Sequence, residues 1–171
     1  MNYLLDSNSY IQAKNFYYQM DFCPGYWDWL DYQFTAGELG SVSMVYDELK
    51  EYGDELSVWV KNRKHHFLDI SDDRTQKQFI EILEHTSTLQ NMKPGNIADF
   101  LGKADPWLIA KAKALNAVVV THEKLVAENS TVVKIPNICI KFGVKYMDTF
   151  QLLRILKARF IMHIGEDSPR T

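Results

Sequence analysis

The run Ala117-Val118-Val119-Val120 is the feature of this sequence that most constrains its fold. Its residues are all apolar and mostly β-branched, so a strand made of them must be buried on both faces. Such strands belong to parallel sheets that helices cover on both sides. Asp105-Pro106, shortly before the run, is a typical helix start with Asp as the N-cap, and apolar residues then recur at helical spacing as far as Leu115. A helix that leads directly into a buried strand indicates an α/β fold.

The rest of the chain alternates short apolar strands with longer segments of helical period. Strands are expected at 3–5, 41–42, 67–70, 117–120 and 131–133. Helices are expected at 9–20, 26–34, 43–52 with Ser43 as N-cap, 54–64, 72–89, 105–115 and 148–160 with Asp148 as N-cap. Pro94-Gly95 is expected to break the chain. The alternation predicts a central, mostly parallel sheet flanked by helices, with a single domain over 1–164 and a frayed tail over 165–171.

Composition narrows the class of protein further. The 171 residues are 46% hydrophobic, which suffices for the core of one domain, and no window approaches the roughly 18 apolar residues of a membrane span. Cys23 and Cys139 form no CxxC pair and the five histidines form no HxxxH or HExxH pattern, so neither a disulfide framework nor a zinc site is expected. The N-terminus has no basic region, so we expect no signal peptide and a cytoplasmic protein.

Charge is unevenly distributed along the chain. Although the net charge is -3, residues 1–100 hold 8 of the 19 basic and 16 of the 22 acidic side chains, so residues 101–171 are basic. A basic surface of this kind forms salt-dependent contacts with RNA phosphates. The same excess of basic residues is also found on an ordinary solvated face that binds nothing.

Four acidic residues are placed where a parallel sheet binds its ligands, at or near the carboxyl ends of its strands. Asp6 follows the first expected strand, and Glu123 follows the 117–120 strand, with Thr121 between. Asp105 opens the helix that leads into that strand, and Glu48 lies on the helix after the 41–42 strand. Carboxylates that meet in one concave site repel one another unless a divalent cation lies between them, and all-oxygen ligation suits Mg²⁺ or Mn²⁺. Such a metal polarises a phosphodiester and activates a water molecule.

The same acids lie in segments that resemble the motifs of PIN-domain ribonucleases. Leu5-Asp6-Ser7-Asn8 is similar to their opening motif, and Val45-Tyr46-Asp47-Glu48-Leu49 to their central Glu-Leu helix. Ala104 to Ala110 resembles their third motif, an Asp followed by a helix with Ile-Ala, and Val119 to Glu123 their fourth, a strand followed by Thr and an acid. The order and the spacing of the four segments agree with the family from Asp6 to Glu123.

The resemblance implies a PIN-like three-layer fold and a Mg²⁺- or Mn²⁺-dependent endoribonuclease, often the VapC-like toxin of a type II toxin–antitoxin pair. It makes Asp6, Glu48, Asp105 and Glu123 catalytic, metal-binding acids, with Asn8 and Thr121 in support. The family more often has Asp or Asn at the last position, so Glu123 binds the metal directly, through a water or not at all. RNA is then the substrate, and an antitoxin protein and a second copy of the chain are the protein partners to consider.

Several alternatives remain open from the residues alone. The alternative for Asp105 is a purely structural role as a helix cap, and the alternative for Glu48 is an ordinary exposed position on a helix. A catalytically silent PIN-like interaction module would keep the same fold. A phosphatase with Asp6 as nucleophile lacks a second carboxylate at Asn8, and a dinucleotide-binding enzyme lacks GxGxxG. Nine of the 22 aromatic residues lie between positions 16 and 34, where helical spacing favours core packing over base stacking or a partner groove.

Overall fold

The computed structural model describes residues 1–89 and 93–161, and its centre is a parallel sheet with strand order β3-β2-β1-β4-β5. The strands are β1 (Tyr3–Leu5), β2 (Leu39–Val42), β3 (Phe67–Leu68), β4 (Val118–Val120) and β5 (Tyr146–Met147). The neighbouring strands all pair in parallel, and Leu5 of β1 lies opposite Val120 of β4. The carboxyl ends of the strands therefore share one edge, where the residues after β1 and β4 are neighbours.

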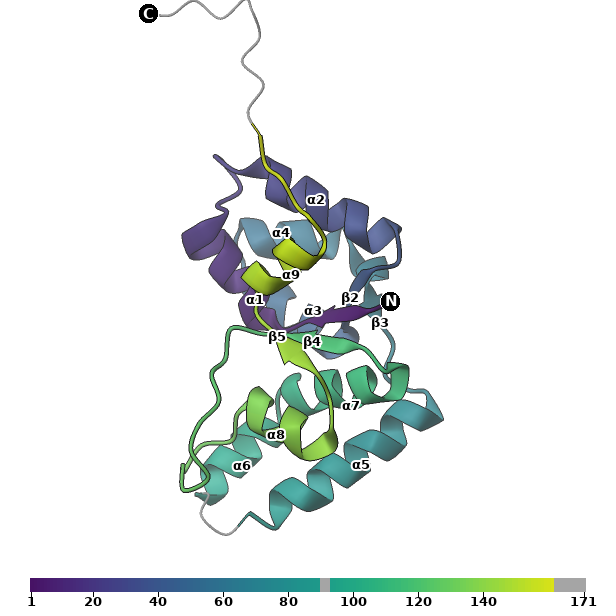
Figure 1. Ribbon diagram of the computed structural model, residues 1–171, viewed down its shortest axis with the longest axis vertical. Helices are drawn as coiled ribbons and strands as arrows, with labels where there is room; N and C mark the ends of the chain where they lie inside the picture. The colour runs from purple at the N-terminus through teal and green to yellow at the C-terminus, as the bar shows by residue number, and fades with distance from the viewer. Residues whose placement is uncertain (90–92, 162–171) are drawn as a thin grey trace, which may run out of the picture.

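Helices cover both faces of this sheet. They are α1 (Ser7–Gln12), the π-helix η1 (Ala13–Tyr17), α2 (Pro24–Thr35), α3 (Ser43–Lys50), α4 (Glu55–Lys61), the 3-10 helix η2 (Lys64–His66), α5 (Asp73–Ser87), α6 (Pro94–Leu101), α7 (Asp105–Leu115), α8 (Ile135–Phe142) and α9 (Thr149–Ile155). Figure 1 shows α1, α2, α4 and α9 on one side of the sheet and α5 to α8 on the other. The predicted α/β architecture with a parallel sheet between helices is confirmed.

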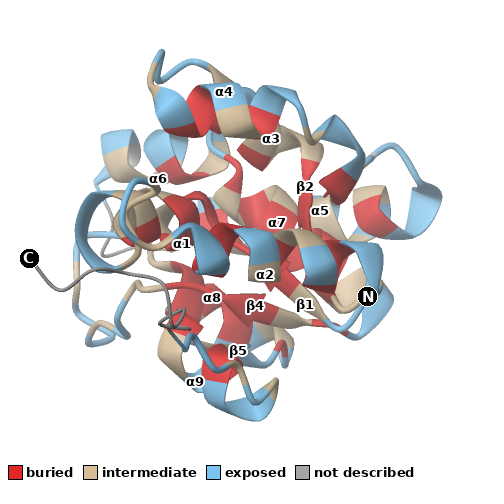
Figure 2. Cartoon of the chain, turned by 90° about the horizontal axis from the view of Figure 1, so that it is seen from above, coloured by how far each residue is buried: buried red, intermediate tan, exposed pale blue. Residues whose placement is uncertain are grey.

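The core lies where α7 packs on the sheet. Leu108 and Ile109 of α7 are fully buried, as are Leu4 and Leu5 of β1 and Val120 of β4. Figure 2 shows the buried residues gathered along the sheet and α7, with exposed residues on the outer helices. A strand buried on both faces was the first prediction from the sequence, and it is confirmed by Val119 and Val120, which point to opposite faces of the sheet and are both fully buried.

Helix α5 covers the outer side of α7. Lys111 of α7 is buried and forms an ion pair of 2.6 Å with Asp72, the N-cap of α5. The rings of Phe79 and Trp107 stack between the same two helices at a centroid distance of 3.5 Å. These contacts fix the direction of α7, whose first residue is Asp105.

The prediction of a strand at 131–133 is wrong, because these residues form an irregular segment before α8. α6, α8 and β5 were not predicted, and the break expected at Pro94-Gly95 is instead the first turn of α6. The helix expected over 9–20 divides into α1 and η1. The last helix begins after its predicted cap Asp148, which forms a capping box, but ends at Ile155 rather than 160, and Lys157 has a positive φ of 53°.

Two further details of helix capping differ from the sequence expectation. Ser43 is the first residue of α3 and not its N-cap, which is Val42. Asp105 is likewise the first residue of α7, and its side chain caps nothing, because Ala104 occupies the N-cap position with helical backbone angles.

The remaining expectations from composition have mixed outcomes. Cys23 and Cys139 are free thiols, as expected. Tyr26, Trp27 and Phe34 are buried, which confirms core packing for that part of the aromatic segment, whereas several others are exposed, namely Phe16, Tyr17, Phe22 and Tyr32. None of the helices in the two described ranges has the length and apolar character needed to cross a membrane. The tail expected at 165–171 lies outside the described residues.

Candidate metal centre

Asp6 leaves the sheet at the carboxyl end of β1. Its backbone N–H still donates to the carbonyl oxygen of Val120 at 2.9 Å, so the end of β4 fixes its position. The side chain is 1% exposed and its Oδ2 accepts a hydrogen bond of 2.8 Å from the Thr121 hydroxyl. Burial, together with the charges of Glu123 and Glu48, raises the pKa of Asp6 to about 6 in spite of this bond.

Asp105 reaches the same place from the start of α7. Its carboxylate is not used for capping, so it is available to the site. Burial is the largest cause that raises its pKa to about 8, and the charges of Asp6, Glu123 and Glu48 add to the effect. Only Lys103 acts in the opposite direction among the main causes. A buried and a partly buried carboxylate beside two further acids are a typical surrounding for a bound cation.

Glu48 connects the two. Its carboxylate accepts a hydrogen bond from the Ser7 hydroxyl and another of 2.8 Å from the backbone N–H of Ala104. Ser7 follows Asp6 and Ala104 precedes Asp105, so Glu48 bridges the backbones that carry the other two acids. The neighbouring acid Asp47 is exposed and pairs with Lys50 at 2.6 Å instead. The structure therefore places Glu48 in the site and leaves its neighbour outside.

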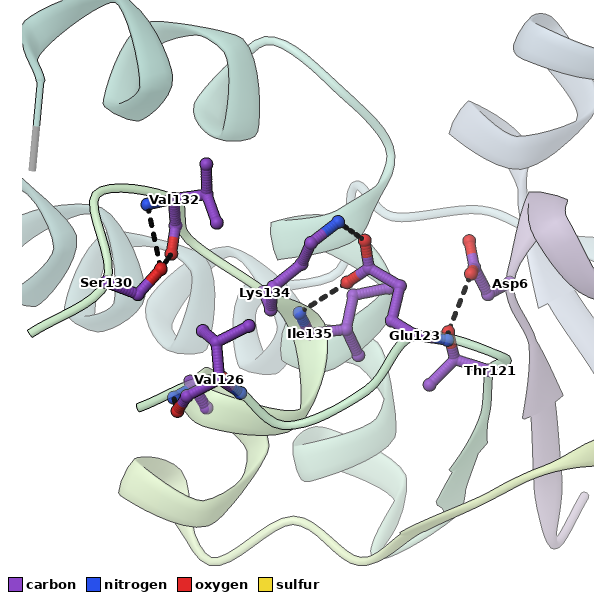
Figure 3. A network of polar contacts seen from close by, with 9 residues as sticks. Asp6, Thr121, Glu123, Val126, Ser130, Val132, Lys134 and Ile135 are labelled. Atoms are coloured by element: carbon purple, nitrogen blue, oxygen red, sulfur yellow. Dashed lines mark hydrogen bonds and ion pairs between the residues drawn. The ribbon is translucent and has the colours of Figure 1, made fainter. Parts of the chain in front are cut away.

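Glu123 lies in the loop after β4, and its carboxylate is turned away from Asp6 (Figure 3). Its Oε1 accepts from the Lys134 ammonium at 2.5 Å, and its Oε2 accepts from the backbone N–H of Ile135, at the start of α8, at 2.8 Å. The backbone N–H of Glu123 donates to the Thr121 hydroxyl at 3.1 Å. Thr121 thus joins the loop to Asp6, whereas the side chain of Glu123 belongs to the α8 side of the site.

A cavity of about 540 Å³ brings the predicted residues together. The acids Asp6, Glu48, Asp105 and Glu123 line it, with Asn8 beside them. A smaller cavity of about 140 Å³ shares Lys103, Asp105 and Glu123 with the first and adds Lys134. Of the predicted residues, Thr121 lines neither cavity but binds Asp6. Lys103 and Lys134 belong to the basic segment 101–171, and nothing in their spacing pointed to the site.

The chemistry of the donors fits Mg²⁺ or Mn²⁺, because every candidate ligand is a carboxylate. Within residues 1–89 and 93–161, however, no three His, Cys, Asp or Glu side chains are arranged closely enough to hold a metal ion. The hydrogen bonds explain this, since Glu48 and Glu123 direct their oxygens at protein donors rather than at Asp6 and Asp105.

His122 contributes no ligand to this set. Its ring packs against those of Tyr17 and Phe150, at centroid distances of 5.9 and 5.6 Å. The ring is half-buried, and burial lowers the pKa of His122.

Comparison with known proteins shows a family and a fold. The model of a domain of unknown function, DUF4411, matches residues 3–160. No curated protein matches the chain. A chain in the crystal structure of VapBC2 from Rickettsia felis, bound to a DNA fragment from their promoter, is similar with a TM-score of 0.51 and 16% sequence identity, over 86% of this chain and 98% of that chain. At this identity the likeness shows the fold alone, and the PIN-like fold expected from the sequence is confirmed.

Proposed function

We propose that this chain, which belongs to the DUF4411 family, is an endoribonuclease that hydrolyses RNA phosphodiester bonds with Mg²⁺ or Mn²⁺. The observation that carries the proposal is a pair of carboxylates at the carboxyl edge of a PIN-like sheet, of which Asp6 is buried and Asp105 is partly buried. Burial and the charges of neighbouring acids raise both pKa values, to about 6 for Asp6 and about 8 for Asp105. Buried anions of this kind are costly to the fold, and a divalent cation offsets that cost.

Each residue of the site has a separate task in this proposal. Asp6 and Asp105 supply the central oxygen ligands, and the Thr121 hydroxyl orients Asp6 through its bond of 2.8 Å. Glu48 adds negative charge beside them and ties both backbone segments together through Ser7 and Ala104. When bound there, a divalent cation supplies the polarisation of the phosphodiester and the activated water that hydrolysis needs.

The proposal extends to the biological role. The similar solved chain comes from VapBC2. On that analogy we propose that this chain is a cytoplasmic toxin and that its partner is an antitoxin protein. A second copy of the chain is a further candidate partner. Inducing the wild type and Asp6→Asn in a bacterial host tests this role, because only the wild type is expected to arrest growth and degrade RNA.

The biochemical test is cleavage of RNA by the purified chain with EDTA, Mg²⁺ or Mn²⁺. We expect cleavage only with a metal, and the loss of most of it in Asp6→Asn and Asp105→Asn. Asp47→Asn is the matched control, because it removes the same kind of charge next to Glu48 but outside the site. Undiminished cleavage by both site variants, or equal loss in the control, rules out the assignment.

A catalytically silent PIN-like interaction module is the second candidate. The observation that favours it is the engagement of Glu48 and Glu123 with protein donors, which leaves no described set of three acids arranged for a metal. A Mn²⁺ titration separates the two functions. A silent module binds Mn²⁺ no better than Asp6→Asn does, whereas the nuclease loses Mn²⁺ affinity on that substitution.

A further inference from the structure

The site has a side branch that the proposed metal chemistry does not use. The cavity of about 140 Å³ opens beside Asp105 and Glu123 and contains the ammonium-bearing side chains Lys103 and Lys134. Its volume is well below the roughly 300 Å³ at which pockets for whole small molecules begin, so it suits one small group of a larger ligand. Because Lys103, Asp105 and Glu123 also line the larger cavity, a ligand can occupy both at once.

Glu123 is built into this branch as an anchor. Lys134 and the backbone of Ile135 engage one oxygen each, and the Glu123 side chain is only 13% exposed. The partner Lys134 keeps 36% of its side chain exposed. An ammonium has three donors, so one bond to Glu123 fixes its place and leaves the other two for a ligand.

Lys103 completes the branch from the other side. It lies two residues before Asp105 and is exposed, and in the described part of the chain no carboxylate comes within ion-pair distance of it. Asp99, Asp105 and Glu123 also line the branch. Lys134 pairs with Glu123, the proposed metal offsets Asp105, and Lys103 forms no ion pair with Asp99 in the described ranges, so the Lys103 ammonium is available to an incoming anion.

We propose that Lys103 and Lys134 bind an RNA backbone phosphate next to the cleaved bond, and that Glu123 positions Lys134 instead of binding the metal. The inference rests on the proposed ribonuclease function and deepens it. Lysines recognise phosphate as point charges with several donors, and such contacts release counterions from RNA. The fourth acid of the PIN-like pattern therefore serves substrate binding in this chain, and Glu123 is a positioning residue.

The first measurement is the salt dependence of binding, with a fluorescein-labelled oligouridylate and with Ca²⁺ in place of Mg²⁺. The logarithm of the binding constant falls linearly with the logarithm of the salt concentration. Each lost phosphate contact makes this slope less steep by about 0.7 for single-stranded RNA. We expect this decrease in Lys134→Ala, Lys103→Ala and Glu123→Gln, and recovery in Lys134→Arg. Lys145→Ala is the charge-matched control, because Lys145 precedes β5 at the opposite edge of the sheet.

The second measurement is Mn²⁺ affinity without RNA, which a metal ligand changes and a positioning residue does not. We expect Glu123→Gln and Lys134→Ala to keep the Mn²⁺ affinity of the wild type, while Asp105→Asn weakens it. The inference is overturned if Glu123→Gln weakens Mn²⁺ binding as much as Asp105→Asn does. It is equally overturned if the salt dependence of RNA binding is as steep in Lys134→Ala as in the control Lys145→Ala. It is also overturned if the wild type does not bind the oligonucleotide.

The two proposals fail in different ways. A wild type that binds the oligonucleotide with the expected slopes but cleaves no RNA supports the lysine site and removes the ribonuclease function. A wild type that cleaves RNA while Lys103→Ala and Lys134→Ala leave the slope unchanged supports the ribonuclease function and removes the lysine site. Circular dichroism of each variant shows whether it is folded. If Lys134→Ala does not fold, Lys134→Arg still tests the site, because it keeps the positive charge at this position.

Discussion

Replacing Asp105 by Asn should stabilise the metal-free protein, although it removes a central residue of the proposed site. The pKa of Asp105 is raised from 3.8 to about 8 in the folded protein, so between these values the folded state binds a proton that the unfolded state has lost. Stability contributed by this group is thus fully present below about pH 4 and is lost as the pH rises toward 8. At about 1.4 kcal/mol for each pKa unit, the cost at pH 7 has an upper limit of about 4 kcal/mol.

Asn has nearly the same shape as Asp and no charge, and within residues 1–89 and 93–161 the Asp105 side chain has no hydrogen bond that the substitution would remove. Urea unfolding in EDTA should therefore show Asp105→Asn more stable than the wild type at about pH 7, by about 1–4 kcal/mol. The difference should vanish near pH 4 and shrink when Mg²⁺ binds the wild type. Asp47→Asn, an exposed control, should stay within about 0.5 kcal/mol. Equal or lower stability of Asp105→Asn at pH 7 would refute the reasoning.

Three further substitutions test the surroundings of the site. Thr121→Val removes a hydrogen bond that favours ionised Asp6, so an NMR titration should show the pKa of Asp6 above about 6, and an unchanged pKa contradicts this. Lys111→Met breaks the ion pair that chiefly lowers the pKa of Asp72. Because the Asp72 side chain is 46% exposed, we expect a loss of only about 1 kcal/mol at neutral pH, and this difference fades as the pH falls from about 4 toward the lowered pKa of Asp72. Leu108→Ala should cost about 2–5 kcal/mol in urea unfolding, since the side chain is fully buried, and a cost below 1 contradicts the packing.

The buried centre of the fold could be predicted from the sequence, and its edges could not. The 117–120 run and the strand at Tyr3–Leu5 have a strong apolar pattern because they lie between two layers of helices. Thr131-Val132-Val133 has the same β-branched character, but it lies in an irregular segment outside the sheet, with Val132 exposed. β5 has only two residues, Tyr146 and Met147, which is too short for any periodicity to appear.

Proline is ambiguous for a related reason. Pro94 was interpreted as a break, and the structure instead begins α6 there. Proline has no N–H to lose at a first helical turn, where that donor has no partner in any case. The same property of Pro106 helps α7 to start, and it does not reveal whether Asp105 is the cap or the first helical residue. Only the helical backbone of Ala104 decides this, and it frees the Asp105 carboxylate for the site.

The meeting of the acids follows from topology, whereas their hydrogen-bond partners do not. Residues after β1 and β4 are neighbours because these two strands pair in parallel; the sequence placed Asp6 and Glu123 after the two strands but did not predict the pairing. The direction of a carboxylate depends on donors that are distant in sequence, as with Glu48 and Ala104, or that belong to an irregular loop, as with Glu123 and Lys134. A carboxylate that the fold already supplies with two donors has less reason to turn toward a cation than one that has none. The hydrogen-bond partners of each acid therefore decide its proposed role. They favour Asp105 as a metal ligand and Glu123 as the residue that positions Lys134.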